Sequence, residues 1–238
     1  AEMKIRIKRK NKKIIKEEMM MPMDLPSGYN IIIDYDHGSI EVSYEFDDSR
    51  GDVDTLGLEG MVDATNLFGG CLDDVYLINT ANVNIKGYGP MLYDVLIERL
   101  AEDGFGITAD RDLVSEHAWN IWDYYFNIRS GEFEIIRMDV SRKSMVKYFG
   151  DDDKKWPFQQ LTDKDTSDDC SQNASLEWAA GMGDWQKHKP KDRSNNVKAN
   201  PDKAANWHKE PISYAYKKKE SSMFILDELR SLSMLRGT

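Results

Sequence analysis

Alternating apolar and polar residues predict β-strands along the first 140 residues, because successive side chains of a strand point to opposite faces. The turn Asp36-His37-Gly38-Ser39 separates two of these runs and predicts a hairpin. Residues 47–70 are rich in loop-forming types, with a short strand near residues 56–58 as an alternative. The strands predicted in this way are residues 3–8, 29–36, 40–46, 75–83, 106–109 and 133–140.

Three helices are predicted between these strands. Asn11 is placed to cap a helix that Pro22 ends, and Ser115 to cap a helix through Phe126. Residues 90–103 carry apolar side chains on one side at helical spacing. The resulting order is strand, helix, three strands, helix, strand, helix and strand. This order predicts an α/β domain with a mixed central sheet flanked by helices.

The character of the chain changes after about residue 147. Gly, Pro, Asn, Asp and Lys dominate there, and a segment of this composition cannot bury enough apolar area to fold by itself. Its tryptophans stand alone, at positions 156, 178, 185 and 207. The apolar residues from Met223 to Leu235 predict a final amphipathic helix. We therefore expect a folded domain over residues 1–146 and a long irregular polar arm over residues 147–238 that ends in this helix.

The charge of the chain narrows the classes of partner. The net charge of −10 argues against a general nucleic-acid binder, although the stretch from Lys4 to Lys16 is strongly basic. We interpret the basic stretch as a solvated face, with phosphate binding as the alternative. No apolar run reaches the ~18 residues of a spanning helix, so no membrane is expected. Cys71 and Cys170 lie far apart and form no metal pattern, which favours reduced cysteines and no metal site.

The stretch from Val83 to Leu92 carries the clearest chemical signal. It reads Val-Asn-Ile-Lys-Gly-Tyr-Gly-Pro-Met-Leu, so a predicted strand runs into a glycine turn that opens a helix. Gly87 and Gly89 let the backbone approach a ligand closely and point successive N–H groups outward. The helix N-terminus adds a partial positive charge. The turn therefore suits a pyrophosphate, and a plain tight strand-to-helix turn is the alternative.

This stretch resembles the acyl-CoA pyrophosphate loop of the GNAT acetyltransferases, whose pattern is Q/R-x-x-G-x-G/A. The run from Val114 to Tyr125 resembles the helix that follows the fifth strand of that family, and phage-encoded GNAT-like proteins look most similar. The resemblance covers about 140 residues and implies a GNAT-like sheet that binds acetyl-CoA, with the pantetheine alongside the strand that ends near Val83. The residues that it assigns to the cofactor are Val83, Asn84, Lys86, Gly87, Tyr88 and Gly89.

Several residues depart from the family pattern. Asn84 stands where the family has Gln or Arg, and its side chain has a shorter reach. Trp122 stands at the position of the usual proton-donating tyrosine, and an indole cannot act as a general acid. Tyr124 and Tyr125 are the candidates to replace that tyrosine. Asp74 is the candidate general base, with a solvated loop carboxylate as the alternative.

Two functions follow from these expectations. In the first, the chain is a structural or accessory component of a phage-type particle, with a degenerate acyl-CoA site, and the arm over residues 147–238 contacts other protein chains. Its location is then the virion or the host cytoplasm. The polar arm and Trp122 favour this function. In the alternative, the chain is an active acyl-CoA-dependent N-acyltransferase that acetylates an amine, with its rate drawn from positioning and from hydrogen bonds to the oxyanion.

Overall fold

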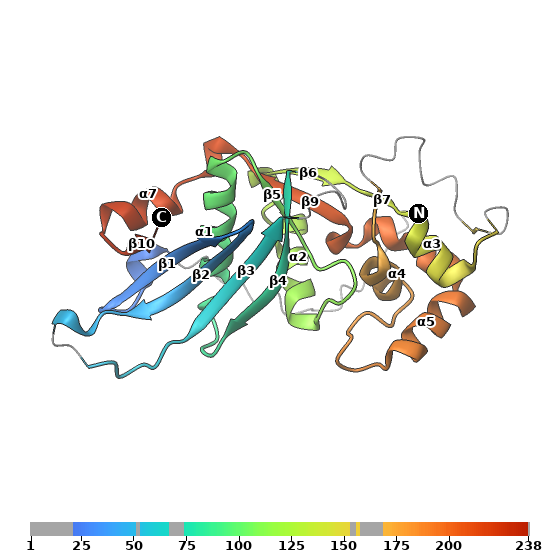
Figure 1. Cartoon of the computed structure of the whole chain (residues 1–238), viewed down its shortest axis with the longest axis horizontal. Coiled ribbons are helices and arrows are strands. Elements are labelled where there is room, and N and C mark those ends of the chain that lie inside the picture. Colours follow the sequence, from blue (N-terminus) through green and yellow to red (C-terminus); the bar gives the residue numbers. More distant parts are fainter. Residues whose placement is uncertain (1–20, 51–52, 67–73, 153–155, 158–168, 238) are drawn as a thin grey trace, which may run out of the picture.

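A mixed β-sheet organises the protein, and it is seen in a computed structural model that describes residues 21–50, 53–66, 74–152, 156–157 and 169–237. The described residues form eight strands in the order β10-β1-β2-β3-β4-β5-β9-β6 (Figure 1). Within this sheet only β4 with β5 and β1 with β10 are parallel. The strands are β1 Tyr29–Asp36, β2 Ser39–Phe46, β3 Gly60–Asn66, β4 Val75–Val83, β5 Gly106–Thr108, β6 Phe133–Arg137, β9 Tyr214–Lys218 and β10 Leu235–Gly237.

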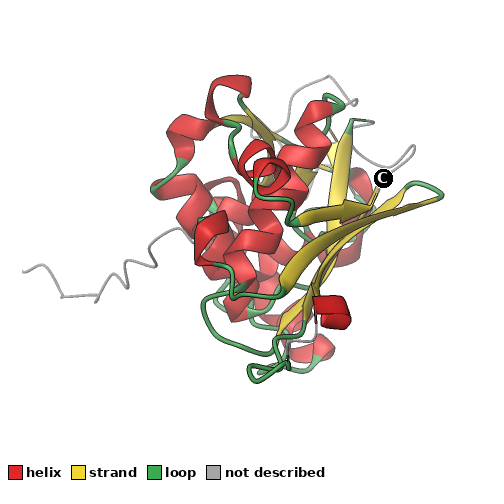
Figure 2. Cartoon of the chain, turned by 90° about the vertical axis from the view of Figure 1, so that its left-hand side faces the viewer, coloured by secondary structure: helices red, strands yellow, loops and turns green. Residues whose placement is uncertain are grey.

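Three helices pack against one face of this sheet and form its core. They are α1 Gly89–Glu102, α2 Glu116–Asn127 and α7 Ile225–Ser231. Every residue of α1 from Met91 to Leu100 except Arg99 is buried. Ser115 caps α2 by accepting a hydrogen bond from the Ala118 N–H at 3.2 Å, as the sequence predicts. Figure 2 shows these helices on one side of the strands.

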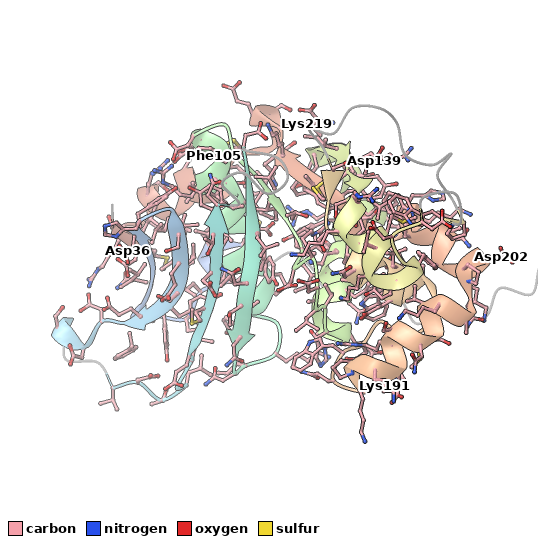
Figure 3. All side chains as sticks on the ribbon, turned by 45° about the vertical axis from the view of Figure 1, so that its right-hand side comes forward. Asp36, Phe105, Asp139, Lys191, Asp202 and Lys219 are labelled. Carbon is pink, nitrogen blue, oxygen red and sulfur yellow. The ribbon has the colours of Figure 1, made fainter. Side chains whose placement is uncertain are left out.

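A helical insertion lies between β6 and β9 and has a core of its own. Its elements are β7 Asp139–Val140, α3 Arg142–Phe149, β8 Asp169–Cys170, α4 Asn173–Ala179, α5 Pro190–Ala199 and α6 Pro201–Ala204. Met145, Leu176, Val197 and Trp207 are among its buried residues. In Figure 3, Lys191 on α5 and Asp202 on α6 lie on the opposite side of the molecule from Asp36 in the β1–β2 hairpin.

The expected irregular arm over residues 147–238 is wrong for the described part of that range. β9 lies inside the sheet, hydrogen-bonded to both β5 and β6. Two of the isolated tryptophans pack within this chain: the Trp178 ring stacks on Trp119 with centroids 5.3 Å apart, and Trp207 is fully buried. The sequence pattern did not predict this folded region, because its buried residues come from several short helices. None of these helices is long enough to show helical periodicity.

The expected final helix from Met223 to Leu235 is shorter in the structure. Helix α7 ends at Ser231, and the chain then turns through Ser233, whose φ is +55°. Residues after the turn form β10 and pair with β1. The apolar face of α7 packs against α1 of the same chain, with Ile225, Leu226 and Leu229 buried.

Most of the other predicted elements are confirmed. These are the hairpin of β1 and β2, the strands β4 and β5, and the helices α1 and α2. Strand β3 was missed, and residues 56–58 form no strand, because small residues such as Ala64 weaken the alternation of Gly60–Asn66. The strand predicted over residues 133–140 is split at Met138 into β6 and β7, which belong to different sheets. The strand and helix expected over residues 3–8 and 11–21 lie outside the described residues, except for Met21 itself.

Candidate functional site

Strand β4 separates from its neighbour halfway along its length. It pairs with β5 only over Val75–Leu77, whereas its pairing with β3 continues to Val83. Ile78 pairs with Ala64 and Thr80 with Asp63, so Asn79 is an extra, bulged residue at the point of separation. Beyond it, within the described chain, β4 has a strand on one side only. Its other edge therefore presents backbone N–H and C=O groups without a strand partner.

Arg111 holds the chain after β5 away from β4. Its guanidinium donates from Nε to the Ala109 carbonyl at 2.8 Å and also to the Ile212 carbonyl just before β9. Burial lowers the pKa of Arg111 to about 10, and the side chain remains charged at neutral pH. The chain after β5 is thus fixed to the residues before β9. On β4, the residues from Asn79 to Asn82 are exposed.

The glycine turn follows directly after this open edge. Gly87 has φ +99°, and a Cβ built on it meets no atom within 4 Å, so the turn needs glycine for its backbone and leaves its outer side open. No side chain caps the N-terminus of α1, and its first turn contains no acidic residue. The Tyr44 hydroxyl donates to the Tyr88 carbonyl at 2.7 Å and fixes the turn on the sheet. Pro90 has no N–H, so the N–H groups of the first turn that remain available to an anion are those of Gly89 and Met91.

The other residues predicted at this turn have separate roles. Lys86 is exposed and forms no ion pair with a described residue, so its ammonium is available beside the turn. Asn84 is used internally: its Oδ1 accepts from the Glu59 N–H at 2.9 Å, and its Nδ2 donates to the Gly57 carbonyl at 2.7 Å. The expected contact of Asn84 with a cofactor is therefore replaced by a structural one. Val83 is half-buried and packs against the core.

The three candidate catalytic residues do not meet at the glycine turn. Asp74 precedes β4, at the opposite end of that strand from Gly87, and forms an ion pair with Lys217. Tyr125 is buried, with its hydroxyl 3.4 Å from Asp94 Oδ1, and burial raises its pKa well above the usual value. Tyr124 is half-buried, with the Arg129 guanidinium 6.0 Å from its ring centroid. These contacts are structural, so none of the three has the geometry expected of it.

Trp122 is also part of the core. It is 1% exposed, and its ring centroid lies 5.2 Å from that of Tyr216 on β9. Cys170 is buried and disulfide-bonded, which differs from the reduced state expected from the sequence.

A buried charge network on α1 was not anticipated from the sequence. Arg129 donates from one nitrogen to both oxygens of Asp94, at 2.7 and 2.9 Å, and pairs with Glu132 at 2.7 Å. Lys218 on β9 pairs with the same Glu132 at 2.7 Å and lies 3.9 Å from Glu98. The available signal was two carboxylates, four residues apart, within the apolar run of α1. The network joins α1, β9 and the turn before β6.

A shallow hollow adjoins the end of β4 that leads into the turn. It has a volume of about 300 Å³ and is lined by Glu59, Gly60, Met61, Asn82 and Asn84. Among the described residues there is no group of His, Cys, Asp and Glu arranged to hold a metal ion. In the same part of the chain, no helix combines the length and the apolar character needed to cross a membrane.

Comparison with protein-family models, with curated proteins and with solved structures finds no match to this chain.

Proposed function

We propose that this chain is a GNAT-type protein that binds acyl-CoA at the turn between β4 and α1. The single observation that carries the proposal is the separation of β4 from β5 next to an uncapped helix N-terminus that opens at a glycine turn. The order of antiparallel strands followed by β4, α1, β5, α2 and β6 is consistent with that fold. The resemblance of residues 83–92 to the family's pyrophosphate loop supports it.

In this proposal the turn binds the pyrophosphate and the open strand edge binds the rest of the cofactor. The first-turn N–H groups of α1 and the ammonium of Lys86 face the phosphates, where the helix dipole favours negative charge. The pantetheine amides pair with the free backbone edge of β4 beyond Asn79, as an added strand would. The thioester then lies near the bulge.

The reaction that fits this arrangement is acyl transfer from the thioester to an amine. The amine nitrogen would attack the thioester carbonyl and form the amide C–N bond while the C–S bond breaks, and the proton that the amine loses would pass to the departing CoA sulfur. Free N–H groups along β4 stabilise the oxyanion that forms. Because Trp122, Tyr124 and Tyr125 are engaged in packing, we assign no proton donor on α2, and the rate comes from positioning.

Calorimetric titration of the full chain with acetyl-CoA tests the proposal. Gly89→Val places a branched side chain where the phosphates approach, while a Cβ at Gly89 meets only Val83, at 3.9 Å. We expect the variant to fold and to bind acetyl-CoA at least about tenfold more weakly, a loss of ~1.4 kcal/mol. Gly131→Val is the matched control, because its Cβ position is also open and lies near β6. Equal affinity of the natural chain and a folded Gly89→Val variant rejects the proposed site.

The second candidate is a structural or accessory role in a phage-type particle, in the virion or host cytoplasm. One observation favours it: the residues that were candidates for proton transfer are all occupied by packing or ion pairs. The support expected from a free arm that binds other chains is lost, since β9 and α7 contact their own domain. Acetyl-CoA binding without any transfer to amines, followed by incorporation of the chain into particles, is the outcome that this candidate requires.

A further inference from the structure

The face of the sheet opposite α1 is left uncovered by helices in the described part of the chain (Figure 2). Side chains alternate along each strand, so residues in register across the strands form rows on this face. One row contains Ile32, Ser43, Met61 and Asn82, which are half-buried or exposed. It ends at the 300 Å³ hollow described above. This face is therefore partly apolar and concave at one end.

The next row of the same face consists of carboxylates. Asp34 on β1 is directly opposite Glu41 on β2, and Glu41 is directly opposite Asp63 on β3. None of the three forms an ion pair with a described residue. Side chains directly opposite each other are about 4.5–5.5 Å apart, and like charges at that spacing are destabilising. Asp63 accepts a hydrogen bond from the amide of Asn79 at 3.0 Å, but this neutral group does not offset the charge of the row. A positively charged partner would relieve the repulsion among the three carboxylates.

The chain contains a segment that complements this face. Residues 4–16 hold eight Lys or Arg and no Asp or Glu, together with four isoleucines, in a protein of net charge −10. The charge and the apolar content of the segment therefore both fit this face.

We propose that residues 4–16 of this chain dock on the uncovered sheet face, with their basic side chains against the row Asp34, Glu41 and Asp63. The isoleucines of the segment then contact the half-buried Ile32 and Met61 beside that row. The inference is independent of acyl-CoA binding. It assigns the basic segment to the chain's own acidic face rather than to a phosphate-containing partner.

A double-mutant cycle in the full chain measures the contact. One variant reverses charge in the segment (Lys12→Glu with Lys16→Glu), the second neutralises the centre of the row (Glu41→Gln), and the third combines them. If the segment docks, Glu41→Gln should raise Tm in the charge-reversed variant, because there it only relieves repulsion among the carboxylates. It should not raise Tm in the chain with the natural segment, because there it also removes an attraction to the basic side chains. The two shifts should differ by about 2 °C or more at low salt and converge in 1 M salt. Equal shifts in both backgrounds overturn the proposal.

Carbodiimide cross-linking of the natural chain gives a second measurement, since this reagent joins only carboxylates and amines in contact. Lysines of residues 4–16 should be joined to Asp34, Glu41 or Asp63 within one monomer. Asp227 is the control, because its side chain is 85% exposed and lies on α7 on the other face. Cross-links found only in covalent dimers assign the face to a second copy. Links formed equally with Asp227, or none with the row, also reject the proposal.

Discussion

Trp122 lies within a group of aromatic rings that join α2 to the sheet. Its neighbours are Tyr125 on the same helix and Tyr216 on β9, at centroid distances of 6.3 and 5.2 Å. Tyr216 in turn packs against Phe133 on β6. The indole therefore occupies the space between α2 and two strands that are distant in sequence. Its position explains why a large apolar ring stands where the family resemblance would place a tyrosine.

Trp122→Ala should destabilise the folded protein. Removing a fully buried indole leaves a cavity, and we expect the free energy of unfolding to fall by about 3–5 kcal/mol in urea denaturation. Trp122→Phe, which retains an aromatic ring, should lose less. A Trp122→Ala protein that is as stable as the natural chain but has lost acyl transfer would show instead that the indole acts in the site.

Glu210 gives a prediction of pH dependence. Burial raises the pKa of its carboxyl, nearby Asp123 raises it further, and the indole N–H of Trp119, which donates at 3.0 Å, opposes this. A raised pKa in the folded state means that the protonated form is favoured on folding. Stability from this group is therefore present below the ordinary pKa of Glu and is lost as pH rises through the folded pKa.

We expect Glu210→Gln to be more stable than the natural chain at pH 7 and equally stable near pH 4. The amide oxygen still accepts the hydrogen bond from Trp119, so the variant isolates the charge. Thermal unfolding at a series of pH values measures the difference. A difference in Tm that stays constant between pH 4 and pH 7 contradicts the assignment.

The sequence predicted the backbone of the glycine turn better than the surroundings of the candidate catalytic residues. Glycine is required at a left-handed position such as Gly87, so that signal is local and readable. The roles of Tyr125 and Asp74 depend on partners far away in sequence, Asp94 for the first and Lys217 for the second. Sequence spacing contains no information about such pairs, so the sequence could not show these contacts, and the catalytic assignments stay predictions.

At the scale of elements, those with local sequence signals were predicted correctly, and those that depend on distant partners were not. β1, β2, α1 and α2 have strong periodicity and local turn or cap signals, and each forms where expected. β9 and β10 are short strands whose pairing partners are β5, β6 and β1, all distant in the chain. Their residues become strands because an edge of the sheet is available to them, and a sequence window cannot show that edge.

Helix α7 is attached to α1 through one buried carboxylate. Glu98 accepts hydrogen bonds from the N–H groups of Phe224 and Leu226, at 3.1 and 3.0 Å, and so caps α7 from another helix. Glu102, one turn further along α1, pairs with Arg230 at the surface. Both carboxylates contact α7, but Glu98 is buried and Glu102 is at the surface. Comparing their variants therefore isolates the effect of burial.

We predict that Glu98→Ala lowers the free energy of unfolding by about 2 kcal/mol or more, because two N–H groups lose their acceptor away from water. Glu102→Ala should cost less than about 1 kcal/mol, as for a partly exposed ion pair. Hydrogen exchange should locate the effect of Glu98→Ala in residues 224–237. Equal losses for the two variants would argue against the capping role.

At the scale of the whole molecule, the C-terminal residues complete the sheet rather than extend from it. β9 separates β5 from β6, and β10 covers the outer edge of β1. The insertion between β6 and β9 is connected to the main core through Gln172, whose amide nitrogen donates to the carbonyls of Met138 and Ser213 at 3.2 and 3.1 Å. The protein is therefore a sheet domain with a helical insertion, in place of the domain and arm expected from the sequence.

This architecture predicts the outcome of limited proteolysis on the free protein. Residues 173–237 should resist trypsin although their sequence is rich in lysine, because cleavage requires local unfolding of strands in the sheet or of helices packed on their own core. Mass spectrometry of the stable fragments identifies the protected range. Rapid cleavage throughout residues 190–220 in the absence of any partner would restore the hypothesis of an assembly arm.

The insertion of β9 between β5 and β6 also affects the order in which a ribosome-bound chain acquires its structure. Strands β1 to β5 pair with near neighbours and are able to associate as they leave the exit tunnel. β6 emerges soon afterwards but has no place in the sheet until β9 has been synthesised, after the whole insertion. During that interval the edges of β5 and β6 are exposed to other strands. Slow translation of the insertion would lengthen this interval and increase aggregation of the nascent chain.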